Sequence, residues 1–564
     1  MGSSPPVRKG ILLLGIVLGL SAFAAGLALA RTYLPEWREM RPRPRQVFRA
    51  RFGELAVRAG FVLGSGEPQI RLATRGPLEY EPFRALGDRG TDWLLATHTG
   101  IRVEVMQEAY HPATRLRGRL LVDFSLDARP HWLAWMTGDL ASLLKPHDPA
   151  ADLRFAHAAM PGILGAGESL GPVRTDMLGT APRLVAPIVG SSPPQRLLVM
   201  LSPLGGVAGR GAEAVSGVPP DSLETMLNRS ATQSARHLFS ILAVLVLFVA
   251  LAIKSRLGVV NGAVLALLCL VTLSPQPVLQ ALSPAFVVPA MMITVLWIFL
   301  AWSCAESLLR STDSGFTTSL DALRAGRLGP RGGRGLLTGF AFGAGLAGLS
   351  LALLSLAVAL PGIWPEAASF NLPVFQPFRS PVADGASLAA GIALALALAL
   401  RVLPLRWAPA AAALTVGILL PPLAIHPLPA ALGANALFAG LLVYVCRHHG
   451  LTALLTAAIV AKLLPLAVFT GLHLDWTPVA FATTMGLAAV IVGLGLLGLT
   501  RSPAAEIQRL ASPVFVRRLE EQRRLVHEMG LLARMQRGLL PRTLPRLEGW
   551  EVAAHSVLAN EAGG

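Results

Sequence analysis

The chain has 564 residues, of which 53% are hydrophobic and 15% are charged, and its mean hydropathy is +0.56. Soluble proteins carry about a quarter charged residues, so this composition excludes an ordinary soluble globular protein. The formal net charge of +16 does not indicate nucleic acid as a partner, because Arg and Lys of membrane proteins gather in cytoplasmic loops. We therefore expect a polytopic α-helical membrane protein.

The first apolar run extends from Ile11 to Ala30 and follows Arg8 and Lys9. About 20 apolar residues are enough to cross the hydrocarbon core of a bilayer, and this run is longer than the apolar core of a typical signal peptide. We predict that residues 1–30 are an uncleaved signal anchor. A signal peptide cleaved after Ala30 is the alternative, because Ala28-Leu29-Ala30 has the small-x-small pattern of a cleavage site.

Residues 31–236 are predicted to form an extracytoplasmic α/β domain with a sensor-like role, which follows from its position alone. Apolar residues at helical spacing predict a helix near its start: Phe48, Phe52, Leu55, Ala56 and Ala59. Residues 101–106, 119–126, 184–189 and 197–201 have the composition of short strands. The last two flank residues 190–195, a connection of hairpin size. The histidines at 98, 111, 131, 147 and 157 lack metal-ligand spacing, and we interpret them as surface residues.

The multi-span membrane domain, residues 237–500, contains nine further apolar runs: 238–253, 257–273, 285–304, 336–361, 386–400, 408–425, 430–446, 451–472 and 477–499. Together with the first run they predict about ten spans, so that both termini lie on the same side. Eleven basic residues then share one side: Lys254, Arg256, Arg310, Arg324, Arg327, Arg331, Arg334, Arg401, Arg406, Arg447 and Arg501. The opposite short loops of this block contain only Arg379. This asymmetry predicts a bacterial inner (cytoplasmic) membrane protein with a cytosolic C-terminus.

One charge cluster runs against this orientation. Five arginines follow the first run and would be outside: Arg31, Arg38, Arg41, Arg43 and Arg45. Long domains are translocated largely regardless of their charge, so we keep residues 31–236 outside.

Ionisable residues inside membrane spans are suspected of function by default. Lys462 lies in the middle of an apolar run, where we expect it to reach the interface or to pair with another helix. The three cysteines, Cys269, Cys304 and Cys446, fall in or beside apolar runs, and we interpret them as small apolar fillers.

Three segments of the membrane domain resemble the motifs of CPBP (Abi) intramembrane proteases in a degenerate form: residues 305–310, 422–426 and 436–444. The resemblance implies that Glu306, Arg310 and His426 derive from a protease site. That family has paired glutamates, and Ala305 stands in place of the first one here. Its last histidine motif has no counterpart around Ile459.

The cytosolic linker, residues 501–540, is predicted to begin two helices at Ser502-Pro503 and Ser512-Pro513, each an N-cap followed by proline. Two heptad seams overlap in it: Phe515, Leu519, Gln522, Val526, Met529, Ala533, Gln536 and Leu540, and Gln522, Leu525, Met529, Leu532, Gln536 and Leu539. Both contain Gln522, Met529 and Gln536. The spacing predicts a coiled-coil homodimer with two near-equal registers. A single apolar face packed on a neighbouring part of the chain is the alternative.

The residues after the linker carry a second resemblance. Gln536, Leu539-Leu540-Pro541 and Leu544-Pro545 precede Gly549, and the sequence ends on Gly563-Gly564. This order resembles the start of the catalytic domain in SpoIIE/RsbU-type bacterial serine phosphatases, of the metal-dependent protein phosphatase superfamily. In that family an aspartate follows the two glycines. The resemblance implies that residues 541–564 are the start of a truncated phosphatase domain, with no catalytic or metal-binding residue in this chain.

The same resemblance implies the chemistry of a full-length product. Mg²⁺ or Mn²⁺ would activate water for attack on a phosphoserine, and the substrate would be a phosphorylated regulatory protein of the anti-sigma-factor-antagonist type. The chain would then be the sensor, membrane and linker part of a signalling phosphatase. The rival hypotheses are an intramembrane protease or its inactive relative, and a transporter-like protein with a regulatory tail.

Overall fold

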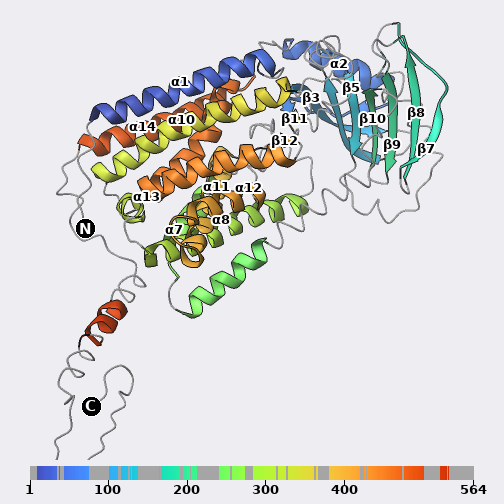
Figure 1. The fold of residues 1–564 in the computed structure, drawn as a ribbon. Helices are drawn as coiled ribbons and strands as arrows, with labels where there is room; N and C mark the ends of the chain where they lie inside the picture. Colours follow the sequence, from blue (N-terminus) through green and yellow to red (C-terminus); the bar gives the residue numbers. More distant parts are fainter. Residues whose placement is uncertain are drawn as a thin grey trace, which may run out of the picture.

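A computed structural model provides the fold. It describes residues 9–34, 37, 43–74, 101–111, 116–124, 128, 130–136, 164, 167–178, 181–190, 195–202, 205–212, 240–254, 257–272, 284–312, 316–324, 328–360, 364–365, 380–419, 423, 425–426, 428–472, 476–500, 521–529 and 531. A helical block, a curved sheet beside one end of it and a short helix beyond the other end make up the described chain (Figure 1).

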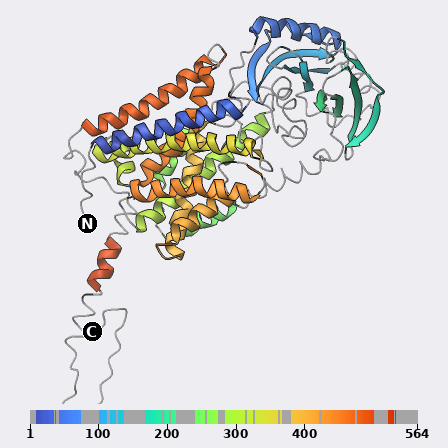
Figure 2. The same cartoon turned by 45° about the horizontal axis from the view of Figure 1, so that its top comes forward.

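The sheet domain contains one helix and ten strands. Helix α2 spans Arg45–Arg58. The strands are β1 Val62–Leu63, β2 Gln69–Thr74, β3 Ile101–His111, β4 Leu116–Phe124, β5 Pro130–Met136, β6 Ser169–Leu170, β7 Arg174–Leu178, β8 Ala181–Val189, β9 Gln195–Ser202 and β10 Gly205–Ala212. They pair antiparallel in the order β1-β3-β4-β5-β10-β9-β8-β6, with β2 also on β3 and β7 also on β8. The sheet curls strongly (Figure 2), which brings its two ends toward each other.

The expected elements of this domain are confirmed. Four of the five predicted helix-face residues, Phe48, Phe52, Leu55 and Ala56, are buried on α2, and Ala59 is buried directly after it. The four predicted strands lie in β3, β4, β8 and β9, and β8 pairs with β9 across the predicted hairpin. The strands β1, β2, β5, β6, β7 and β10 were not predicted, because β10 is rich in glycine and the others are short or contain proline or charge.

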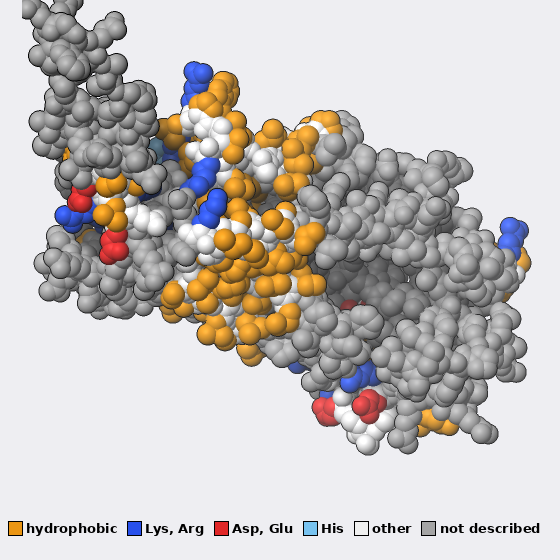
Figure 3. Space-filling model, turned by 90° about the horizontal axis from the view of Figure 1, so that it is seen from below, with side chains coloured by type: hydrophobic (Ala, Val, Ile, Leu, Met, Phe, Trp, Pro, Cys, Tyr) orange, Lys and Arg blue, Asp and Glu red, His pale blue; other side chains and the backbone are white. Residues whose placement is uncertain are grey.

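The helical block consists of the following helices: α1 Lys9–Tyr33, Ser240–Ile253 (without a label in Figure 1), α7 Val260–Thr272, α8 Pro284–Thr312, α9 Thr318–Arg324, α10 Pro330–Ala359, α11 Pro381–Val402, α12 Ala408–Leu419, α13 Leu428–Leu472 and α14 Pro478–Thr500. Two short strands, β11 Trp364–Pro365 and β12 Ile425–His426, pair at the end nearer the sheet. Every predicted apolar run overlaps one of these helices. In Figure 3 the central part of the described surface is mostly apolar, as expected for a surface in contact with lipid, and charged side chains lie around its edges.

Six described helices are long and apolar enough to cross a membrane: α1, α8, α10, α11, α13 and α14. The chain is therefore a helical membrane protein. Helix α13 breaks at Gly450, whose φ of 81° is not helical, so it contains two of the predicted runs. Three other runs form helices of only 12 to 14 residues, or about 20 Å at 1.5 Å per residue. The predicted number of spans stays a prediction.

Close glycine contacts fix the relative direction of α1 and α10. A Cβ atom on Gly19 would lie 2.2 Å from the Ala341 carbonyl oxygen, and one on Gly26 would lie 2.2 Å from that of Gly348. Contacts that advance together along both chains mean that the helices run parallel. Such small residues let helix backbones approach closely within a membrane. Helix α1 thus packs closely on α10, and the choice between an uncleaved anchor and a cleaved signal peptide stays a prediction.

The other neighbours of α10 follow the same logic. Gly335 faces Thr452 and Gly343 faces Val460, so α10 runs parallel to the second part of α13. Helix α14 runs antiparallel, because Gly333 contacts Gly498 whereas Leu337, one turn further on, contacts Gly495.

Candidate functional site

The predicted pair Glu306 and Arg310 lies in a buried polar cluster at one end of the helical block. The two residues are four apart on α8, which places them on the same helix face. Asn261 joins them from the first turn of α7, and Asp321 joins them from α9. All four side chains belong to buried residues, with exposed fractions of 2% for Glu306, 7% for Arg310, 6% for Asn261 and 5% for Asp321.

Arg310 and Asn261 each bridge the two carboxylates of this cluster. The Arg310 Nη2 atom donates to Glu306 Oε1 at 2.6 Å and to Asp321 Oδ1 at 2.5 Å, and its Nε donates to Glu306 Oε1 at 3.0 Å. The Asn261 amide donates to the same two oxygens at 2.8 and 3.0 Å. The indole Nε1 of Trp302 donates to Glu306 Oε2 at 3.1 Å.

This geometry is typical of a structural polar cluster that holds helices together, rather than of a reaction centre. Both oxygens of Glu306 already accept hydrogen bonds from the protein, so this carboxylate has little freedom to polarise a water. Buried charges are tolerated when paired and hydrogen-bonded, and the cluster meets both conditions while joining α7, α8 and α9. Among the described residues, no group of three or more His, Cys, Asp or Glu side chains could hold a metal ion.

His426, the third residue of the protease-like set, does not join this cluster. It lies on β12, where its backbone pairs with Trp364 of β11. Strand β11 follows the C-terminal end of α10, whereas α9, which carries Asp321, precedes the N-terminal end. Helix α10 has 30 residues, or about 45 Å at 1.5 Å per residue. The structure therefore brings together two of the three residues and places the third at the opposite end.

The C-terminal end of α8 also contacts the linker helix. Arg523 donates to the backbone carbonyl of Ser311, and Arg401 at the end of α11 donates to the Ser311 hydroxyl. The last carbonyls of a helix have no partner within the helix and favour cations nearby. The described linker residues 521–529 are helical, and Ser311 directly follows Arg310 of the buried cluster.

The predicted seam is only partly described. Gln522, Leu525 and Val526 are exposed and Met529 is half-buried, with Leu525 and Val526 exposed to 58% and 63%. An apolar surface of this kind is compatible with a partner helix. Gln536 and the phosphatase-like residues Leu539, Leu540, Pro541, Leu544, Pro545, Gly549, Gly563 and Gly564 lie outside the described residues.

The opposite end of the block joins the sheet domain through aromatic side chains. The Trp37 and Phe469 rings meet edge-on with centroids 5.9 Å apart, and Phe48 of α2 meets Trp476 at 5.8 Å. Arg45 lies over the Trp476 ring and donates to its backbone carbonyl at 3.2 Å. One buried apolar core includes residues of both the sheet domain and the helical block.

Most of these residues were not predicted from the sequence, among them Asn261, Trp302, Asp321 and Trp476. Asn261 is a polar residue inside an apolar run, a signal that could have been used, whereas Asp321 lies in a connecting segment without any pattern. The three cysteines are buried and unpaired, as expected for apolar fillers, and Lys462 is half-buried in α13. Comparison of the chain with protein-family models, with curated proteins and with solved structures gives no match.

Proposed function

We propose that the chain is the sensor, membrane and linker part of a SpoIIE-type protein serine/threonine phosphatase. The single observation that carries the proposal is the position of the linker helix. It contacts the end of α8 that holds the buried cluster, at the opposite end of the block from the sheet domain. Among the described residues, the helical block lies between the sheet domain and the linker, so a change in the sheet domain would reach the linker through this block. The phosphatase-like motif follows this linker in the sequence.

The helix directions support ten spans in this proposal. Under alternating spans, α1, α10 and the second part of α13 share one direction and α14 has the other, as their glycine contacts require. The side-chain hydrogen bond between Thr272 and Ser380, at 3.1 Å, joins the end of α7 to the start of α11, which alternation also places on one side.

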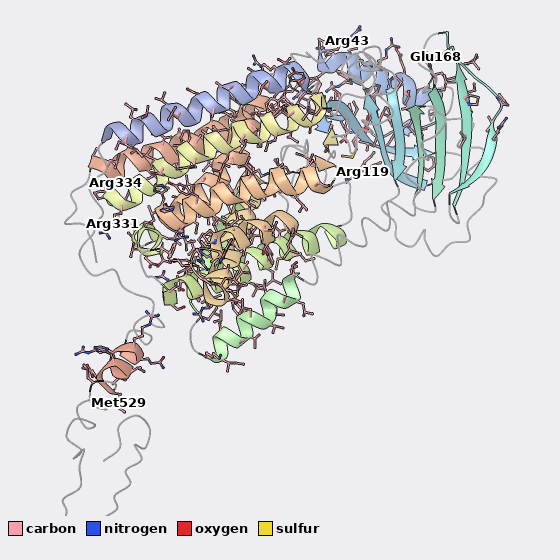
Figure 4. The ribbon with its side chains drawn as sticks, viewed as in Figure 1. Arg43, Arg119, Glu168, Arg331, Arg334 and Met529 are labelled. Carbon is pink, nitrogen blue, oxygen red and sulfur yellow. The ribbon has the colours of Figure 1, made fainter. Side chains whose placement is uncertain are left out.

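The basic residues of the helical block agree with this orientation, whereas those at the sheet end belong to a long domain that would be translocated regardless of charge. Arg331 and Arg334 lie at the end of the block that faces the linker, on which Met529 is labelled, whereas Arg43 and Arg119 lie at the sheet end (Figure 4). We assign the linker end to the cytosol and the sheet domain to the outside of a bacterial inner membrane.

The catalytic chemistry in this proposal belongs to residues beyond Gly564. In the part of the chain that the structure describes, no group of three or more His, Cys, Asp or Glu side chains could hold a metal ion. In this proposal the carboxylates that would hold Mg²⁺ or Mn²⁺ follow Gly563-Gly564. The chain contributes a coiled-coil homodimer at Gln522, Met529 and Gln536 that would position two phosphatase domains. A phosphorylated regulatory protein would be the partner in the cytosol.

The buried cluster weighs against the protease hypothesis. A protease site needs a carboxylate that can activate water, and Glu306 already accepts hydrogen bonds on both oxygens. With His426 at the other end of α10, the remaining residues cannot share one substrate. We therefore retain the phosphatase proposal.

The test is activity of the gene product translated past Gly564. Purified protein should release phosphate from a phosphoserine protein with Mn²⁺ and stop when a chelator is added. The matched control is residues 1–564, which should show no turnover. An extended product without Mn²⁺-dependent phosphatase activity, or chelator-sensitive turnover by residues 1–564 alone, would contradict the proposal.

A further inference from the structure

The ten-stranded sheet consists of two units with the same order of pairing. In the first unit β1 and β2 pair with one edge of β3, and β3, β4 and β5 form a meander. In the second unit β6 and β7 pair with one edge of β8, and β8, β9 and β10 form a meander. We infer that the sheet arose by tandem duplication of one five-stranded unit and that the two copies are related by a twofold axis between β5 and β10.

The starts of the two units correspond residue by residue. Gly60 and Gly167 both have positive φ, 79° and 82°, a conformation that favours glycine. Each is followed three residues later by Leu-Gly, which are Leu63-Gly64 and Leu170-Gly171. Two positive-φ glycines at the same distance from the same dipeptide are not required by a meander.

The next contact is also duplicated. The Gly64 amide donates to the Glu108 carbonyl at 2.8 Å, and the Gly171 amide donates to the Pro187 carbonyl at 2.8 Å. Glu108 of β3 therefore corresponds to Pro187 of β8. The strands β2 and β7 then begin in the same register, because their first residues pair two positions before Glu108 and Pro187 respectively.

A shared tetrapeptide continues this register. Arg-Leu-Leu-Val occurs at residues 119–122 of β4 and at residues 196–199 of β9. Arg119 pairs with Glu108 and Arg196 pairs with Pro187, the two residues already matched by their glycine partners. Because a slip of one residue would turn every side chain to the other face, this agreement is specific.

The seam between the units completes the symmetry. Arg119 pairs with Met136 on β5 and Arg196 pairs with Gly211 on β10, so Met136 corresponds to Gly211. The same correspondence matches Trp132 to Val207, Leu133 to Ala208 and Ala134 to Gly209.

Applied to the seam, this correspondence exchanges the pair Trp132–Gly209 with the pair Ala134–Val207, and both pairs are present. The pair Leu133–Ala208 maps onto itself. The twofold axis therefore passes through Leu133 and Ala208.

The units differ in what surrounds the shared strands. The connection from β2 to β3 spans residues 75–100, whereas that from β7 to β8 spans only residues 179–180. Long insertions in connections cost little, so this difference does not oppose a common origin. Helix α2 joins the first unit to the helical block, because its Phe48 contacts both Phe124 of β4 and Trp476. The strands β7 and β8 lie at the far side of the sheet (Figures 1 and 2). The first unit, β1–β5, thus lies next to the helical block, and the second unit, β6–β10, extends away from it.

The direct test replaces the second unit by a copy of the first within the full chain. Residues 166–211 would be exchanged for a second copy of residues 59–136, with Leu133→Cys in both copies and the native cysteines replaced by alanine. Strands related by a twofold axis should place the two new cysteines opposite each other, where Cβ atoms are about 4.5–5.5 Å apart. A short thiol cross-linker should then join them within one chain.

The control has one alanine inserted after the copied Trp132, which shifts the seam by one residue. We expect efficient intramolecular cross-linking in the chimera and at least a tenfold lower yield in the control. Equal yields, or a chimera as sensitive to protease as the control, would overturn the inference.

A milder pair of variants tests the equivalence without rebuilding the domain. Gly60→Ala and Gly167→Ala should lower the Tm of the full chain in detergent by amounts within a factor of two of each other, since both force alanine to positive φ. Gly66→Ala, with no positive φ and no atom within 4 Å of the new Cβ, is the control and should leave Tm unchanged. A large loss at one of the two glycines and none at the other would contradict the duplication.

Discussion

The two ends of the helical block are joined to their neighbours in different ways. At the sheet end, aromatic rings of Trp37, Phe48, Phe469 and Trp476 belong to contacts within or beside a core shared by both parts. At the linker end, a charged cluster joins helices within the block, and Arg523 of the linker makes the described contact with Ser311 of α8. A shared apolar core moves as one body, whereas a polar contact at the surface can open at little cost. A relay requires this difference: the sheet domain must move together with the helical block, and the linker must be able to dissociate from α8.

The largest effect is expected from disrupting the buried polar cluster around Arg310. Arg310→Met removes the bridge between Glu306 and Asp321 and leaves two buried carboxylates without their cation. Breaking a buried pair in this way costs about 3–5 kcal/mol, so the Tm of the chain in detergent should fall steeply. Lys254→Met, at an exposed position, is the matched control and should change little. Equal Tm for both variants would show that the cluster does not hold α7, α8 and α9 together.

A second, smaller loss should follow from separating α1 and α10. Gly26→Ala places a methyl group 2.2 Å from the Gly348 carbonyl oxygen, so the helices must move apart, at about 1–3 kcal/mol for an overpacked contact. Gly15→Ala, with no atom within 4 Å of the new Cβ, should be tolerated. An unchanged Tm for Gly26→Ala would mean that α1 does not pack in the block and would favour the hypothesis of a signal peptide cleaved after Ala30.

The sheet end can be tested by a double-mutant cycle. Phe48→Leu and Trp476→Leu each remove one ring of an edge-on pair, and the pair is worth about 0.5–1.5 kcal/mol beyond its buried area. The two free-energy losses should therefore fail to add by that amount. The exposed Val62→Ala combined with Trp476→Leu should be additive. Additive losses for Phe48→Leu and Trp476→Leu would indicate that the two rings do not stabilise the contact between the sheet domain and the helical block.

The smallest change in stability is expected at the linker end. Arg523→Ala removes one exposed contact to the Ser311 carbonyl and should leave Tm nearly unchanged, with Arg524→Ala as the neighbouring control. The effect should instead appear as a higher cross-linking rate between linkers carrying Gln522→Cys, because release from α8 frees the seam for a partner. Equal cross-linking rates with and without Arg523 would show that its contact with α8 does not control dimerisation of the linker.

Sequence patterns predicted most of the fold because hydrophobic periodicity acts locally. The apolar runs became helices, and alternating segments such as residues 101–106 became strands. The pairing of β5 with β10 could not be predicted, since glycines at 205, 206, 209 and 211 carry no hydrophobic pattern. The site followed the same division: Glu306 and Arg310, named by the resemblance, lie four residues apart on one helix and meet locally, whereas Asp321 reaches them only through the tertiary fold. His426 was grouped with them by resemblance, and no local rule could show that α10 separates them.

The proposed relay requires the sheet domain and the linker to lie on opposite sides of one membrane. Single cysteines at exposed positions, Ser65→Cys in the sheet domain, Thr312→Cys at the end of α8 and Gln522→Cys in the linker, test it in a chain without native cysteines. A maleimide that cannot cross the inner membrane should label Ser65→Cys in intact spheroplasts and the other two only after lysis. Labelling of Ser65→Cys and Gln522→Cys from the same side would contradict the proposed relay.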